Sequence, residues 1–314
     1  MIQKMKLTKS SVSQILEKYN VGEITSFSLI EKGERNSTYV ILTNQGKFIL
    51  KIYEECNIEK IMVEIQLLEK LSKANIPVPK IVKTVSNDYL LYLYQKGIAM
   101  FTFLDGKHIK NESANLKQIK SLGENLGIIH KNTMNFKPKN IELKNIYDYD
   151  NKWILNALVS IKKDMPELPN KYEKFVSNIL ENISIPKLVQ GLNHGDFQED
   201  NIMFMGNKVS GIIDFDDCFY GNLLSDVALF IGMWCIDKEI DFDKCKCFIQ
   251  AYESKRKLTE KEKKYLYDQS KLFMLMHFTY WLWDEENWND NIKPIKTLNN
   301  LQKITKEEFM QKIF

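Results

Sequence analysis

The sequence predicts an α+β protein with two lobes, a small N-terminal lobe built on an antiparallel sheet and a larger, mostly helical C-terminal lobe. β-Branched and aromatic residues alternate through residues 25–53 and are interrupted by turn residues. Beyond Asp105 and Gly106, apolar residues recur mainly at helical spacing. We therefore expect residues 1–102 to form the first lobe and residues 103–314 to form the second.

The N-terminal lobe begins with a short predicted helix. Apolar residues recur at helical spacing in residues 12–19, behind the cap candidates Ser10 and Ser11. Two groups of turn residues, at 31–36 and 44–46, then divide the alternating segment. Three antiparallel strands are the simplest structure for it.

A helix and a further strand region complete this lobe. Residues 58–73 place apolar side chains on one helical face, and Pro77 and Pro79 end that helix. A strand region covers residues 89–104. Its last part, residues 102–104, is predicted to be a strand-like hinge.

The C-terminal lobe contains a series of predicted helices and one hairpin. The hairpin consists of two short apolar runs, residues 202–205 and 209–215, on either side of Gly206 and Asn207. The predicted helices cover residues 116–130, 153–163, 171–182, 224–234, 244–252 and 260–283.

The composition excludes several classes of protein. The chain has 314 residues and a formal net charge of +3, with basic and acidic groups spread along it. This distribution gives no field suited to nucleic acid or an anionic membrane. Five cysteines without paired spacing indicate neither disulfides nor a structural zinc site. The longest apolar run, residues 227–236, is about half the ~20 residues of a membrane span, so we expect a cytoplasmic protein without a membrane partner.

The segment 194–201, followed by the segment 212–217, carries the predicted chemistry. Phosphoryl transfer from ATP requires a carboxylate near the acceptor hydroxyl, oxygen ligands for Mg²⁺ and a cation for the phosphates. Asp196 is placed to orient the acceptor hydroxyl. Asn201, five residues later, and Asp214, returned by the hairpin, are candidate Mg²⁺ ligands.

Lys51 supplies the candidate cation. It stands in an otherwise apolar strand, and a buried lysine needs an anion. Glu64 on the following helix is the natural partner, which leaves Lys51 directed at the α- and β-phosphates of ATP. The turn at residues 33–37 could lay backbone N–H groups over the triphosphate, with Ser37 as a further donor.

The order HxDxxxxN, a hydrophobic strand and an aspartate resembles the catalytic signature of the aminoglycoside phosphotransferase and choline kinase superfamily, a branch of the protein-kinase-like fold. The resemblance extends over nearly the whole chain. Residues 26–39, 98–106 and 226–235 are similar to segments of its bacterial homoserine kinase-like branch.

This resemblance implies a protein-kinase-like two-lobed fold, with an N-terminal nucleotide-binding lobe and a C-terminal lobe for catalysis and substrate binding. It also implies ATP and Mg²⁺ as cofactors and a small-molecule hydroxyl acceptor. The implied roles are Asp196 as catalytic base, Asn201 and Asp214 as Mg²⁺ ligands, Lys51 as phosphate anchor, the backbone of Thr102, Phe103 and Leu104 as adenine hinge, and Asp226 as the structural support of the catalytic loop. His194 is expected to support the same loop by hydrogen bonding.

The acceptor is less well defined by the sequence. Homoserine is the first hypothesis, and an aminoglycoside, amino-sugar or choline-type acceptor is the alternative. Glu199, Asp217 and Trp234 are candidates for the acceptor pocket, although Trp234 also fits the core of the helical lobe.

Two further classes of protein are less consistent with the sequence. The chain reads Asp214-Phe-Asp216 where protein kinases have Asp-Phe-Gly, and no Ala-Pro-Glu follows, so a protein kinase is disfavoured. A non-catalytic kinase-like binding or spore-coat protein is a further alternative. The presence of Lys51, Asp196 and Asn201 together with Asp214 argues against it.

Overall fold

The computed structural model describes residues 4–31, 35–55, 57–141 and 150–314. The chain forms two compact units. Unit 1 comprises Met1–Asp105, Pro138–Ile141 and Gly211–Asp216, and unit 2 comprises Gly106–Lys137, Glu142–Ser210 and Asp217–Phe314. The chain thus returns to unit 1 for a short segment that includes the predicted metal ligand Asp214.

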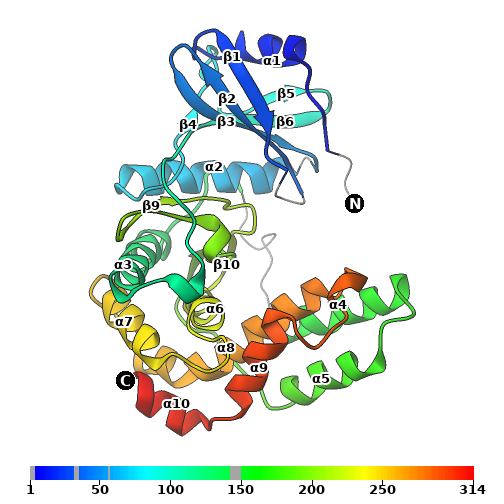
Figure 1. Cartoon of the computed structure of the whole chain (residues 1–314), viewed down its shortest axis with the longest axis vertical. Coiled ribbons are helices and arrows are strands. Elements are labelled where there is room, and N and C mark those ends of the chain that lie inside the picture. Colours follow the sequence, from blue (N-terminus) through cyan, green and yellow to red (C-terminus); the bar gives the residue numbers. More distant parts are fainter. Residues whose placement is uncertain (1–3, 32–34, 56, 142–149) are drawn as a thin grey trace. The chain divides into compact units, whose positions relative to one another are not determined.

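Unit 1 is built on an antiparallel sheet (Figure 1). Its strand order is β1-β2-β3-β6-β4, and β5 pairs with β6. The strands are β1 (Ile24–Leu29), β2 (Ser37–Thr43), β3 (Gly46–Tyr53), β4 (Ile81–Val82), β5 (Leu91–Leu93) and β6 (Lys96–Thr102). The three strands predicted in residues 25–53 are present, whereas no sequence pattern indicated the two-residue strand β4.

Helices α1 (Lys9–Leu16) and α2 (Ile58–Lys73) lie on opposite faces of this sheet (Figure 1). Leu50 and Ile52 of β3 join the apolar cluster around α1. Because side chains alternate along a strand, the intervening Lys51 points to the other face, toward α2. This alternation brings Lys51 to Glu64.

The start of α1 differs from the prediction. Thr8, not Ser10 or Ser11, caps the helix, and its side chain accepts a hydrogen bond from the Ser11 amide. The helix therefore begins at Lys9, and both serines lie inside its first turn.

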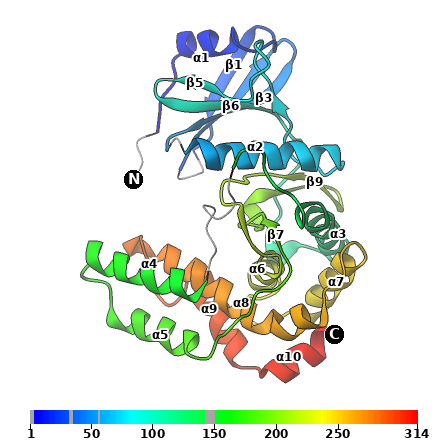
Figure 2. The same ribbon diagram turned by 180° about the vertical axis from the view of Figure 1, so that it is seen from behind.

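Unit 2 is mostly helical. The helices are α3 (Leu116–Thr133), α4 (Asn151–Asp164), α5 (Asn170–Leu180), α6 (Leu224–Trp234), α7 (Phe242–Glu253), α8 (Glu260–Trp281), α9 (Lys293–Gln302) and α10 (Lys306–Ile313), with short 3₁₀ turns at Asn111–Ser113, Glu199–Asn201 and Glu285–Asn287. Figure 2 shows α3 lying against α7. Among the described helices, none combines the length and the apolar composition that a bilayer-spanning segment requires.

Two small strand pairs interrupt the helices. The predicted hairpin is present as β8 (Ile202–Met205) and β9 (Lys208–Ile212), although β9 ends before Phe215. The second pair, β7 (Gln190–Asn193) with β10 (Phe219–Asn222), is antiparallel. It was not predicted from the sequence, and it carries the loop that begins at His194.

Candidate active site

The predicted catalytic loop of unit 2 follows β7 and depends on Gly195. This residue has a φ of +86°, and a Cβ added there would lie 2.1 Å from the backbone oxygen of Asp217. A larger residue is therefore excluded both by conformation and by space. Gly195 allows the loop backbone to contact the backbone of Asp217, and Asp196 follows as the next residue of the loop.

Asp226 on α6 holds the backbone of this loop. Its Oδ2 accepts a hydrogen bond from the His194 amide at 2.7 Å, and its Oδ1 accepts one from the Gly195 amide at 2.9 Å. The ring of His130 lies 3.0 Å from the same carboxylate. Burial alone raises the pKa of Asp226, but the hydrogen bond from His130, with the loop contacts, brings the pKa below its ordinary value. Asp226 is therefore an ionised anchor for the loop.

The ring of His194 lies beneath the same loop. It is fully buried, and its Nδ1 accepts a hydrogen bond from the Asp196 amide at 3.2 Å. This contact fixes the backbone at Asp196. A ring nitrogen so used is not directed at a reacting group.

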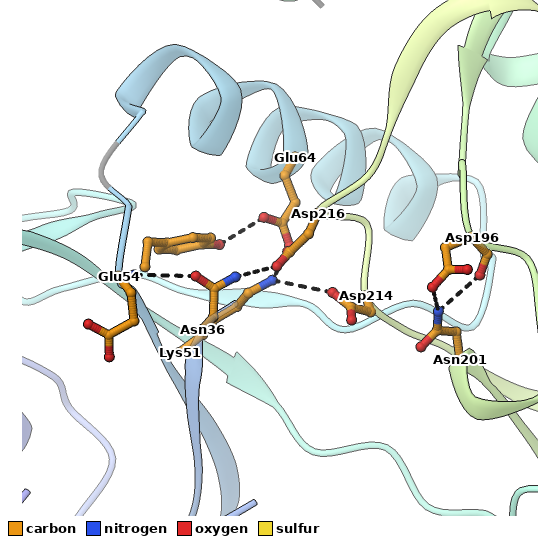
Figure 3. A network of polar contacts seen from close by, with 9 residues as sticks. Asn36, Lys51, Glu54, Glu64, Asp196, Asn201, Asp214 and Asp216 are labelled. Atoms are coloured by element: carbon orange, nitrogen blue, oxygen red, sulfur yellow. Dashed lines mark hydrogen bonds and ion pairs between the residues drawn. The ribbon is translucent and has the colours of Figure 1, made fainter. Parts of the chain in front are cut away.

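Asn201 orients the carboxylate of Asp196. Its side-chain amide nitrogen donates to Asp196 Oδ2 at 2.6 Å and to the Asp196 backbone oxygen at 2.9 Å. Gln198 donates to the same Oδ2 at 3.1 Å. Both amide hydrogens of Asn201 are thus used, and its oxygen points away from Asp196 (Figure 3). An amide oxygen is a donor of the type that Mg²⁺ accepts.

A cluster of charged side chains surrounds Lys51 in unit 1 (Figure 3). Its Nζ lies 3.0 Å from Glu64 and 3.7 Å from Asp214, and it donates a close hydrogen bond to Asp216. The hydroxyl of Tyr53 donates to the second oxygen of Glu64 at 2.9 Å. One buried ammonium group therefore faces three carboxylates.

The three carboxylates do not share this ammonium group equally. Burial by itself lowers the pKa of Lys51, but the charges of Asp216, Glu64 and Asp214 outweigh burial and raise that pKa well above its ordinary value. Burial likewise raises the pKa of Asp216, but Lys51 brings it below the usual range. At Glu64 burial dominates and raises the pKa to about 8. Glu64 therefore keeps its proton near neutral pH.

Asp214 is the most accessible carboxylate of the cluster. Its side chain is 51% exposed, against 16% for Asp216 and 6% for Glu64. The residue follows β9 with a φ of +63°, in the left-handed region that aspartate tolerates at a cost of about 1 kcal/mol. This backbone conformation turns Asp214 out of the line of the strand.

The available donors suit Mg²⁺ better than a metal with several protein ligands. Among the described residues, no group of three or more His, Cys, Asp or Glu side chains is arranged to hold a metal ion. Mg²⁺ is usually bound by one or two protein oxygens together with phosphate oxygens and water. The exposed carboxylate of Asp214 in unit 1 and the amide oxygen of Asn201 in unit 2 are each, taken separately, a donor of this type.

The predicted hinge has little backbone donor capacity left. The amide of Thr102 donates to the Lys80 oxygen at 2.9 Å, and the amide of Phe103 donates to the Lys47 oxygen at 3.3 Å. Within the part of the chain that the structure describes, no backbone hydrogen bond uses the amide of Leu104. Of the three hinge residues, Leu104 is therefore the one with an N–H group for a ligand.

Three side chains that were expected to contact a ligand have hydrogen-bond partners within the protein. Ser37 is fully buried in β2 and its hydroxyl donates to Glu54, so it does not offer a donor to phosphate. Both oxygens of Glu199 already accept hydrogen bonds at 2.7 Å, from Lys110 and from the Asn111 amide. Trp234 is buried in the core of unit 2, and its indole N–H donates to the Phe197 oxygen at 3.1 Å. These side chains are committed to the protein itself.

Two residues of the charged cluster had no predicted role. Asp216 is one of them, although a second carboxylate two residues after Asp214 was a usable signal. Asn36, whose amide donates to Asp216, carries no signal in the sequence that distinguishes it from an ordinary turn residue. The predicted phosphate turn falls partly on Gly33 and Glu34, which lie outside the described residues.

Comparisons with known proteins match most of the chain. The profile described as "Phosphotransferase enzyme family" matches residues 26–253. The homoserine kinase of Methylobacillus glycogenes is 27% identical over 256 residues, which is 80% of this chain and 77% of that protein.

Solved structures match nearly the whole chain at low sequence identity. A microcompartment-associated aminopropanol kinase has a TM-score of 0.68 at 16% identity and covers 97% of this chain and 100% of its own. An amicoumacin kinase in complex with AMP-PNP, Ca²⁺ and its antibiotic has a TM-score of 0.67 at 15% identity, covering 98% and 94%. These matches confirm the predicted α+β, kinase-like fold.

Proposed function

The chain belongs to the phosphotransferase enzyme family, and we propose that within it the protein transfers the γ-phosphoryl group of ATP to the hydroxyl group of homoserine. The observation that carries the reaction is the carboxylate of Asp196, held by the amide of Asn201 at 2.6 Å. The choice of acceptor rests on the homoserine kinase similarity over 80% of the chain.

Asp196 acts on the acceptor hydroxyl. Phosphoryl transfer needs an attacking oxygen held in line and a carboxylate to accept or orient its proton. Asn201 and Gln198 both hold Oδ2 of Asp196, which fixes the orientation of the carboxylate that we assign to the acceptor hydroxyl. His194 and Asp226 keep the loop backbone from moving this carboxylate.

Lys51 acts on the nucleotide. Its pKa lies well above the ordinary value, so it is a permanent cation at neutral pH. In this role the ammonium group exchanges its contact with Asp216 for phosphate oxygens, while Glu64 keeps the side chain in place at 3.0 Å. The amide of Leu104 offers a hydrogen bond to adenine. Asn201 and Asp214 would hold Mg²⁺, which would supply positive charge beside the phosphates when bound.

A coupled assay of ADP release tests the proposal. The purified protein, with ATP and Mg²⁺, is given homoserine, choline, 1-aminopropan-2-ol, glucosamine or kanamycin at equal concentrations. We expect homoserine to give the highest kcat/KM and a product that carries one phosphate on its hydroxyl group, identified by mass spectrometry. A higher kcat/KM with any of the other acceptors would reject homoserine but keep the reaction.

A matched pair of variants tests the catalytic carboxylate. Asp196→Asn removes the proton acceptor, and Asp200→Asn makes the same change in the neighbouring 3₁₀ turn Glu199–Asn201. Asp196→Asn should lower kcat by about 100-fold or more with little change in the Kd for ATP. Asp200→Asn should retain activity within a few-fold. Equal losses in both variants, or full activity of Asp196→Asn, would contradict the assignment.

A further inference from the structure

A line of buried polar side chains leads from the start of α8 to the catalytic loop of unit 2. Arg256 donates to Glu262 at 2.6 Å and to the hydroxyl of Tyr252 at 2.8 Å. That hydroxyl lies 2.8 Å from Nδ1 of His130. The other ring nitrogen of His130 lies 3.0 Å from Asp226, the anchor of the loop. These residues are at most 6% exposed.

The direction of each hydrogen bond in this line follows from which side chains can donate and which can accept. An arginine only donates, so the oxygen of Tyr252 accepts from Arg256 and its hydroxyl hydrogen is free for Nδ1 of His130. A His130 ring that accepts at Nδ1 carries its hydrogen on Nε2 and donates it to Asp226. Burial lowers the pKa of His130, which agrees with a neutral ring. From Arg256 onward, the hydrogen bonds to Tyr252, from Tyr252 to His130 and from His130 to Asp226 therefore all point toward Asp226.

Two features fix the line at its far end and in its middle. Glu262 accepts from the backbone and hydroxyl of Thr259 in the capping box of α8, so its carboxylate is already immobile where it meets Arg256. In the middle, α3 approaches α7 closely, since a Cβ on Gly127 would lie 2.7 Å from the backbone oxygen of Tyr252. That approach brings the ring of Tyr252 edge-on to His130, with ring centroids 5.6 Å apart.

We propose that Tyr252, Arg256 and Glu262 are positioning residues for the phosphoryl transfer. They hold His130 in the Nε2–H tautomer, so that Asp226 receives three donors and keeps the backbone of His194 and Gly195 in place. The inference rests on the proposed role of Asp196, because that residue follows directly in the same loop. Nothing in this line touches the nucleotide or the acceptor.

The test compares Tyr252→Phe with Tyr267→Phe. Both changes remove one buried hydroxyl from unit 2, but the hydroxyl of Tyr267 donates to the backbone oxygens of Leu301 and Ile304. Tyr252→Phe should lower kcat about tenfold, the usual effect of one lost buried hydrogen bond, with KM nearly unchanged. Tyr267→Phe should lower stability and leave kcat unchanged. Glu262→Gln, which loosens Arg256 without removing volume, should change kcat in the same direction by a smaller factor.

Two readouts do not depend on turnover. The chain has four histidines, so the ¹⁵N signals of their rings can be assigned by single substitutions. His130 should show the Nε2–H tautomer alone in the wild type and a mixture of tautomers in Tyr252→Phe. The amides of His194 and Gly195 should exchange with solvent about tenfold faster in that variant.

The outcomes separate the proposal from the proposed function. Unchanged tautomer and amide exchange in Tyr252→Phe would overturn the positioning role, whatever the activity. Equal losses of kcat in Tyr252→Phe and Tyr267→Phe would overturn it as well, because they would indicate general destabilisation. If no acceptor is phosphorylated by the wild type, the proposed function fails, and the two spectroscopic readouts still decide whether the line controls the loop.

Discussion

Replacing Glu64 by glutamine tests the charge balance around Lys51. The pKa of Glu64 is raised from 4.5 to about 8, so between these values the folded protein keeps a proton that the unfolded chain has released. Stability therefore falls as pH rises through this window, by about 1.4 kcal/mol per pH unit from this group. From pH 5.5 to pH 7.5 the wild type should lose roughly 2 to 3 kcal/mol that Glu64→Gln retains.

Urea unfolding at half-unit steps of pH measures this difference. Glutamine keeps the shape of Glu64 and an oxygen for Lys51, so the two proteins should have similar stability at pH 5.5 and diverge above it. Glu69→Gln, on the same helix but paired with exposed Lys73, is the matched control and should follow the wild type. Parallel curves for Glu64→Gln and the wild type would refute the reasoning, because they would mean that Lys51 keeps Glu64 ionised throughout.

Three further predictions concern single positions. Gly195→Ala should lower the free energy of unfolding by about 2 kcal/mol or more, seen in a thermal melt, because its Cβ meets the Asp217 oxygen at 2.1 Å; an unchanged Tm would contradict the close approach. Burial lowers the pKa of His277 to about 4, so stability should fall as pH drops from 6.5 toward 4, and His277→Gln should lack this loss in the same urea series. Asp214→Asn should weaken Mg·ATP binding about tenfold in calorimetry while ATP binding without Mg²⁺ changes little; equal affinities would exclude Asp214 as a ligand.

The sequence predicted those elements whose signals are local. The predicted bounds of α2 and α6 agree with the structure, because each is a continuous periodic run between clear breaks. The pair β7 and β10 was missed because each strand has only four residues and its partner lies almost thirty residues away. No propensity within either segment indicates such a pairing. The missed Thr8 cap shows the same limit at smaller scale, because Thr8, Ser10 and Ser11 are equally good cap residues by type.

The residues of the candidate site show the same contrast between local signals, which the sequence contains, and tertiary contacts, which it does not. Asp196 and Asn201 were predicted from their spacing. Because only a short loop separates them, their side chains lie close enough for a hydrogen bond. The protein partners of Ser37 and Glu199 were not predicted, because a polar side chain gives no sign, in sequence, of the partner that tertiary structure supplies. The proton on Glu64 was also beyond sequence reasoning, since it depends on how deeply three carboxylates are buried around one lysine.

The buried carboxylates differ in ionisation because they differ in the number of donors that reach them. Asp226 receives two backbone amides and the ring of His130, and its pKa falls although it is fully buried. Glu64 receives the hydroxyl of Tyr53 and a lysine that it shares with Asp216, and its pKa rises. Burial opposes ionisation at both positions, so the donors, together with the negative charge of Asp216 beside Glu64, decide the outcome. A motif in the sequence shows that carboxylates are present. Only the donors and charges around each one show which carboxylate is ionised at neutral pH and which keeps its proton.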